Sequence, residues 1–142
     1  FICQFFSKPL LELIESCDLV FGNESEAEAF STMMKYETFS IENVAKEIAN
    51  MKGRKRTVVI TQGADATYVF QNGEGKSYPV PKIAPEEIVD TNGAGDAFVG
   101  GFLAQKIKGE SIENCVNAGH YAASVIIKVS GTTLSGKPTW SN

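Results

Sequence analysis

Apolar and polar residues alternate along the first half of the chain with the periods of helices and strands. Residues 10–17, 23–34 and 40–51 repeat apolar positions every three or four residues, which predicts three helices. Residues 18–21 and 56–61 are short apolar runs, which predict buried strands. Because the second run (RTVVIT) is β-branched without alternation, we expect a central strand that is covered on both faces.

The residues at the starts of these helical segments are typical of helix beginnings. Pro9 stands where a first helical turn tolerates proline. Asn23 and Ser40 are candidate N-caps, and Glu24 and Glu26 place negative charge in the first turn of the second helix. The capping signals therefore agree with the apolar periodicity.

The second half begins with a predicted β-hairpin and continues into two long helices. Residues 66–71 and 76–80 flank Asn72-Gly73, a dipeptide typical of tight hairpin turns, and the prolines of the second arm suit a sheet edge. Residues 94–107 and 111–129 are largely apolar and predict helices. Strands that alternate with helices indicate an α/β sandwich with a mostly parallel sheet.

Composition limits the number of domains to be expected and the classes of partner that the chain could bind. With 142 residues, 43% of them hydrophobic, and no visible linker, we expect one domain. No run approaches the roughly 18 apolar residues that cross a bilayer, so we expect no membrane partner. The net charge is −4, which argues against nucleic acid. The densest cationic stretch, residues 52–56 (KGRKR), is predicted to be a solvated connection.

Cysteine usage predicts a reducing compartment. Cys3, Cys17 and Cys115 share no Cys-x-x-Cys spacing and are expected to be free thiols. The chain also starts without methionine and in strand-like apolar sequence (FICQFF), so we expect a piece that is truncated at its front.

Residues 90–102 (DTNGAGDAFVGGF) combine a glycine-rich turn, an acid and the start of a predicted helix. The backbone amides of Gly93, Ala94, Gly95 and Asp96 could lie unpaired at the positive helix end and bind a phosphoryl group. The Asp96 carboxylate could then accept the proton of an attacking hydroxyl, as phosphoryl transfer requires. The alternative is that Asp96 only satisfies the helix start.

Two further groups of residues could contribute to such a site. Asn23 and Glu26 lie one helical turn apart after a predicted strand, where their oxygens could hold hydrated Mg²⁺; plain helix capping is the alternative. Thr61 and Gly63 follow the central strand, at the carboxyl edge where α/β sheets bind ligands.

Two familiar phosphate-binding motifs are excluded. Residues 73–77 (GEGKS) end like a Walker A loop, but Phe70 replaces its first glycine and no helix follows. The dinucleotide pattern G-x-G-x-x-G fails at Phe98. His120, the only histidine, lies in a predicted helix, and a structural role is expected from its local sequence.

These motifs, in this order, resemble the ribokinase-like (PfkB) carbohydrate and nucleoside kinases. DTNGAGDAFVGGFL is similar to the carboxyl-terminal signature of that family, and NESE is similar to its N-x-x-E motif. FGNESEAEAF, ITQGAD and AGHYAASVIIKVSG are similar to the family members that phosphorylate adenosine, and the likeness runs from Phe1 to the tail. The resemblance implies a three-layer α/β/α fold. Residues 1–142 would be the carboxyl-terminal part of its large ATP-binding domain, without the lid domain and the amino-terminal half.

The resemblance also implies a role for each matching position. Asp96 would deprotonate the 5′-hydroxyl of adenosine, with Gly93, Ala94 and Gly95 as the anion hole. Asn23 and Glu26 would organise Mg²⁺ and the ATP phosphates, largely through water. The remaining matches would contact ATP (Thr61, Gly63, Asn92, His120 and Ile127), the nucleoside (Phe1) or a monovalent cation such as K⁺ (Asp90).

The expected function is therefore the ATP-dependent phosphorylation of adenosine in purine salvage, by a monomer in the cytoplasm and also the nucleus. One alternative is a family member with another sugar or nucleoside as acceptor. The other is a nucleotide-binding piece without turnover. We expect the isolated piece to be inactive, because the lid that excludes water belongs to the missing part.

Overall fold

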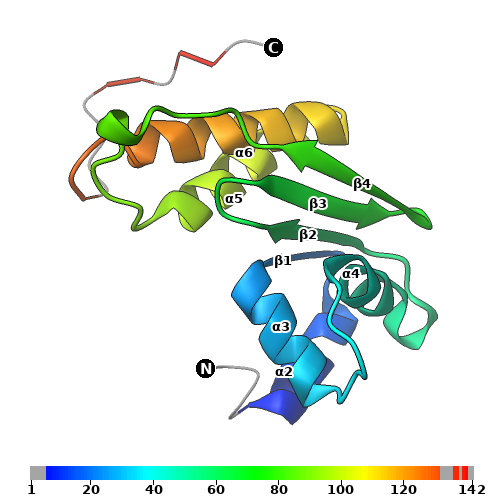
Figure 1. Cartoon of the computed structure of the whole chain (residues 1–142). Helices are drawn as coiled ribbons and strands as arrows, with labels where there is room; N and C mark the ends of the chain where they lie inside the picture. Colours follow the sequence, from blue (N-terminus) through cyan, green and yellow to red (C-terminus); the bar gives the residue numbers. More distant parts are fainter. Residues whose placement is uncertain (1–5, 132–135, 138, 141–142) are drawn as a thin grey trace. The chain divides into compact units, whose positions relative to one another are not determined.

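The computed structural model describes residues 6–131, 136–137 and 139–140 (Figure 1). The chain divides into two compact units, Phe1–Pro79 and Val80–Asn142, which are described separately below. The expectation that the whole chain is part of one larger domain stays a prediction.

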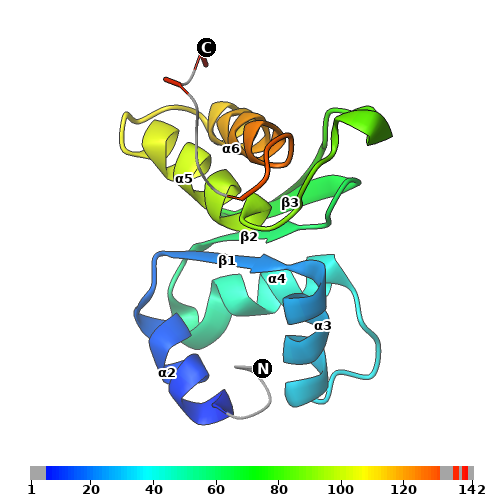
Figure 2. The same cartoon turned by 90° about the vertical axis from the view of Figure 1, so that its left-hand side faces the viewer.

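The first unit packs helices against one face of a sheet. Its helices lie on the same side of the strands in Figure 2, and Figure 1 agrees. The helices are α2 (Ser7–Ser16), α3 (Glu24–Met33) and α4 (Ile41–Asn50). The strands are hydrogen-bonded in sequence order in the described part of the chain: β1 (Leu19–Asn23), β2 (Thr57–Thr61), β3 (Ala66–Gln71) and β4 (Glu74–Pro79).

The α/β class is confirmed, but the sheet is mixed rather than mostly parallel in the described residues. β1 and β2 are parallel, whereas β2–β3 and β3–β4 are antiparallel. The hairpin explains the difference, because it supplies two of the four strands. Its turn residues Asn72 and Gly73 have φ angles of 52° and 88°, as a type I′ turn requires. Gly75 and Lys76 of β4 pair with Phe70 and Val69 of β3, which confirms that GEGKS is part of a hairpin and not a Walker A loop.

The core of this unit is built where β2 meets α4. Val58, Val59 and Ile60 are consecutive and all buried, which confirms a buried strand, and Val58 and Ile60 belong to the apolar core of this unit. Val44 and Ile48 of α4 join the same apolar core. The Ser40 hydroxyl caps α4 by accepting a hydrogen bond from the Asn43 amide, as predicted.

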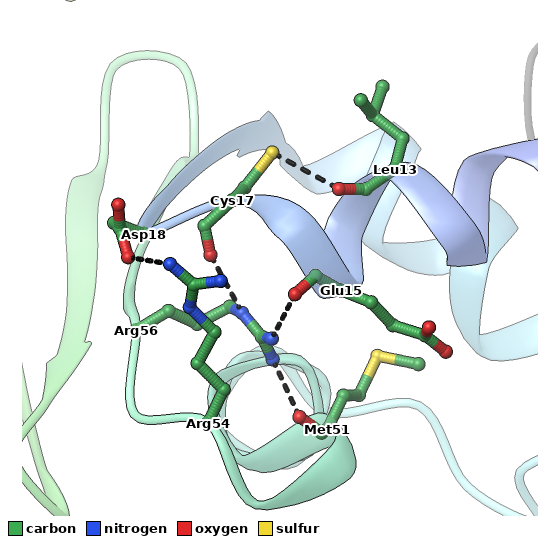
Figure 3. Close-up of polar contacts among 7 residues, drawn as sticks. All are labelled: Leu13, Glu15, Cys17, Asp18, Met51, Arg54 and Arg56. Atoms are coloured by element: carbon green, nitrogen blue, oxygen red, sulfur yellow. Dashed lines mark hydrogen bonds and ion pairs between the residues drawn. The ribbon is translucent and has the colours of Figure 1, made fainter.

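Arg56 corrects the prediction of a solvated cationic stretch. Its side chain is buried, with 3% of its surface exposed, while Lys52 and Arg54 form exposed ion pairs with Glu15 and Asp18. The Arg56 guanidinium donates to carbonyl oxygens at the carboxyl ends of α2 and α4, most of which Figure 3 shows. Helix ends leave such carbonyls unpaired and carry partial negative charge, which a buried cation offsets. The acceptors are Ile48 (2.6 Å), Met51 (3.1 Å), Cys17 (3.1 Å) and Glu15 (3.3 Å).

The second unit contains two long helices, α5 (Ala94–Lys106) and α6 (Ile112–Ile126), after a short 3₁₀ turn η2 (Pro85–Glu87). The helices approach closely at Gly101, where an added Cβ would lie 2.4 Å from the Ala118 carbonyl oxygen. Both predicted helices are confirmed, although α6 ends three residues early in a turn. Among the described residues, no helix is long and apolar enough to cross a membrane.

Candidate active site

A tight turn leads the chain into α5, within the second unit. Gly93 has φ 76° and ψ −1°, the geometry of the third residue of a type II turn, which favours glycine. The turn is closed by the Ala94 amide, which donates to the Thr91 carbonyl at 3.3 Å. Just before it, the Asn92 amide donates to Asp90 Oδ1 at 2.9 Å, a local aspartate turn. The backbone around the predicted anion hole is therefore set by short-range bonds.

The amides of the predicted anion hole are not all available. We expected the Ala94 amide to be unpaired, but it is engaged by Thr91. The first helical hydrogen bond runs from the Ala97 amide to the Gly93 carbonyl at 2.9 Å. Within residues 6–131, the Gly93, Gly95 and Asp96 amides have no hydrogen-bond acceptor. These three amides lie at the positive end of α5, where an anion is stabilised.

The Asp96 carboxylate is exposed at the same helix end. It lines a groove of about 760 Å³ along α5 and α6 that also touches Gly93 and Ala97. In the described part of the chain, its side chain makes no hydrogen bond or ion pair, and α5 has no side-chain cap. Asp96 therefore does not cap α5 through its side chain, although its place in the first turn suits the helix dipole, and its role as general base stays a prediction.

Asp90 is bonded to Ile127 through its amide and to Asn92 through its side chain. The Ile127 carbonyl accepts the amides of Val89 (2.8 Å) and Asp90 (3.2 Å), which ties the loop before the turn to the end of α6. A contact of Asn92 and Ile127 with ATP, and of Asp90 with a monovalent cation, stays a prediction. This connection could not be predicted from local sequence, because the residues that it joins are more than thirty-five positions apart.

His120 packs inside the pair of helices. Its side chain is buried, with 6% exposed, and its ring lies 5.6 Å from the ring of Phe98 on α5. Burial lowers the pKa of His120 below its ordinary value, which favours the neutral imidazole. This environment supports the structural role expected from the local sequence, and a role beside ATP stays a prediction.

In the first unit, Asn23 and Glu26, the residues predicted to organise Mg²⁺, form a capping box through their side-chain oxygens. Asn23 Oδ1 accepts from the Glu26 amide at 2.8 Å, and Glu26 Oε2 accepts from the Asn23 amide at 2.9 Å. Helix capping, the alternative, is therefore present. A carboxylate oxygen has a further lone pair for a water proton, so the pair fits a contact with hydrated Mg²⁺ better than direct ligation. In the described residues, no group of three His, Cys, Asp or Glu side chains could hold a metal ion.

Thr61 and Asn23 are neighbours at the carboxyl ends of two parallel strands. They are register partners in the β1–β2 ladder. Gly63 follows in an exposed turn with φ 57°, beside the bond from the Gln62 amide to the Ala66 carbonyl. The two predicted groups of the first unit thus share one sheet edge, where α/β proteins bind ligands. Phe1, the predicted nucleoside contact, lies outside the described residues.

Comparison with known proteins agrees with this architecture. Residues 1–140 match the pfkB family of carbohydrate kinases, and the chain belongs to that family. It is 49% identical to adenosine kinase 2 of Arabidopsis thaliana, over 97% of this chain and 41% of that protein. It is 38% identical to a cytidine kinase of Thermococcus kodakarensis, over 84% of this chain and 40% of that protein.

The fold is also that of solved kinases. The crystal structure of Anopheles gambiae adenosine kinase in complex with a diadenosine tetraphosphate matches with a TM-score of 0.91 and 42% identity. That match covers 99% of this chain and 43% of the mosquito protein. The chain therefore spans about two fifths of the length of the proteins that it resembles.

Proposed function

We propose that the full-length protein transfers the γ-phosphoryl group of ATP to the 5′-hydroxyl of adenosine and releases AMP and ADP. The observation that carries this proposal is the exposed Asp96 carboxylate beside the Gly93, Gly95 and Asp96 amides, which have no acceptor within the described residues. Family membership supports the kinase chemistry, and the relatives named adenosine kinase support the acceptor.

In the proposed reaction, Asp96 accepts the proton of the 5′-hydroxyl as that oxygen attacks the γ-phosphorus. The O–H bond breaks, a new P–O bond forms, and the bond between the γ-phosphorus and the β,γ-bridging oxygen breaks, so that ADP leaves with the electron pair. The amides of Gly93, Gly95 and Asp96 hydrogen-bond the migrating phosphoryl oxygens, and Ala94 spaces them within the turn. Their contribution is electrostatic, because phosphoryl transfer mainly requires positioning and neutralised charge.

The residues of the first unit are proposed to handle the nucleotide phosphates. Mg²⁺ would neutralise phosphate charge, and Asn23 and Glu26 would contact its water ligands while keeping their capping bonds. Thr61 and Gly63 would line the nucleotide site from their sheet edge. A monovalent cation such as K⁺ would lie by Asp90, whose Oδ1 also fixes the Asn92 amide.

The setting of the reaction also remains a proposal. We infer a monomer in the cytoplasm and also the nucleus, consistent with Cys17 and Cys115 as free thiols in the structure. The lid that excludes water would come from the part of the protein outside these 142 residues.

The test is phosphoryl transfer by the full-length protein from γ-labelled ATP to adenosine, with AMP identified as the labelled product. We expect turnover of adenosine but not of ribose or fructose, and no turnover by residues 1–142 alone. Labelled product from a sugar but none from adenosine would contradict the proposal.

One observation favours a second candidate acceptor. The relative from Thermococcus kodakarensis, which is 38% identical over 84% of this chain, is named a cytidine kinase. Cytidine therefore belongs in the same assay at equal concentration. A higher kcat/KM for cytidine than for adenosine would leave the proposed chemistry at the 5′-hydroxyl unchanged and would make cytidine the preferred acceptor.

A further inference from the structure

The carboxyl end of α6 is joined to the loop that precedes the glycine turn. Ile127 is the C-cap residue of α6, so its carbonyl has no partner inside the helix. It accepts the Val89 and Asp90 amides at 2.8 and 3.2 Å instead. Next to it, Lys128 Nζ lies 2.9 Å from Glu87 Oε1. Two neighbouring residues at the helix end thus hold one short loop segment.

The same segment leads directly into the proposed catalytic turn. Asp90 fixes the Asn92 amide through its side chain, and Thr91 fixes the Ala94 amide through its carbonyl. Two residues further on stands Asp96. A displacement of residues 87–90 would therefore be passed to the turn through consecutive hydrogen bonds, and the amides of the glycine turn would change direction with it.

The ion pair is the part of this connection that depends on side chains. Amide–carbonyl bonds can form with almost any sequence, whereas the pair needs opposite charges at two positions 41 residues apart. The hydrogen bond and charge of Lys128 lower the pKa of Glu87, which keeps its carboxylate ionised. A cation just beyond a helix carboxyl end is also favoured by the helix dipole.

We propose that Glu87 and Lys128 are positioning residues that hold the glycine turn in its working geometry by joining the preceding loop to the end of α6. The expected effect of this ion pair on catalysis rests on the proposed function, whereas its expected effect on the loop is independent of that function. Because both side chains are roughly half exposed (41% for Lys128 and 48% for Glu87), the effect is modest and weakens with salt.

The test uses the full-length protein with Glu87→Gln, Lys128→Gln and the reversed pair Glu87→Lys/Lys128→Glu. Hydrogen exchange of the peptide that carries the Val89 and Asp90 amides reports on the loop, and steady-state kinetics report on catalysis. We expect each single variant to exchange about three- to fivefold faster and to lose kcat by a similar factor, with KM for adenosine unchanged. We expect the reversed pair to recover most of both losses.

Lys82→Gln is the matched control, because Lys82 is an exposed lysine of the preceding segment, and it should behave like the unchanged protein. Unchanged exchange in both single variants, or a reversed pair as impaired as they are, would overturn the proposal. If the unchanged protein phosphorylates no adenosine, the proposed function fails, while the exchange result still decides whether the pair holds the loop.

Discussion

Among the α-helices that the structure describes, α3 and α5 carry an acid at their third residue, and only that of α3 takes part in a capping box. Glu26 of α3 reaches back to the Asn23 amide, because Asn23 is an extended N-cap with φ −105° and ψ 173°. Asp96 of α5 follows Gly93, whose φ of 76° turns the chain differently, and its side chain is one methylene shorter. The two helix starts thus differ in backbone geometry, and in the described residues α5 has no side-chain cap, while the role of Asp96 as a base stays a prediction.

At the scale of single residues, His120 is also expected to make the stability of the folded protein depend on pH. Burial lowers its pKa in the folded protein below the ordinary value near 6.5. The unfolded chain therefore binds a proton in a pH range where the folded chain does not. Stability is full above about pH 6.5 and is lost as the pH falls from there through the folded pKa.

We therefore expect the melting temperature of the full-length protein to fall between pH 7.5 and pH 5.5. The fall should be smaller in His120→Gln, which cannot titrate. Thermal unfolding of both proteins at both pH values measures the difference. An equal loss in the variant would show that another group causes the pH dependence.

At the scale of elements, Arg56 joins the ends of two helices. Its guanidinium donates to backbone carbonyls at the carboxyl ends of α2 and α4. Among the described residues, it forms no ion pair with a carboxylate. Arg56→Met would leave buried carbonyls without donors, which we expect to cost about 2–3 kcal/mol of unfolding free energy. Chemical denaturation of the full-length protein measures this loss.

Arg54→Met is the control for that experiment. Arg54 is two residues away, but its ion pair with Asp18 is exposed, and such pairs contribute about 1 kcal/mol or less. Equal losses in the two variants would show that the buried guanidinium has no special role.

The contact between α5 and α6 depends on one of two adjacent glycines. An added Cβ at Gly101 would lie 2.4 Å from the Ala118 carbonyl oxygen, whereas at Gly100 it would meet nothing within 4 Å. We expect Gly101→Ala to destabilise the protein by about 1–3 kcal/mol, because backbone must move. Gly100→Ala should instead stabilise it by up to about 1 kcal/mol, through helix propensity. Melting temperatures that move in the same direction would contradict this packing.

At the scale of the whole molecule, the sequence predicted what depends on neighbouring residues. Asn72-Gly73 specified the hairpin, Ser40 and Asn23 specified helix starts, and the glycine turn was placed correctly at the start of α5. Each of these features is decided within a few residues, by dihedral preference or a capping bond.

What the sequence did not predict depends on residues that are far apart in the chain. In the sequence, Arg56 cannot be distinguished from the other cations of KGRKR. It is a buried donor only because the carboxyl ends of α2 and α4 lie close together around it. The Lys128–Glu87 pair likewise exists only because α6 ends beside residues 87–90. A single sequence carries no local signal for either contact.

The most direct test of the central claim, that Asp96 is the general base at the glycine turn, compares Asp96→Asn with the unchanged full-length protein. Turnover of adenosine and affinity for ATP are measured on the same preparations, with Glu86→Gln as an exposed acid control. We expect kcat to fall by about 10²–10⁴-fold in Asp96→Asn while ATP binding stays nearly intact. Near-normal turnover in that variant would contradict the role of Asp96.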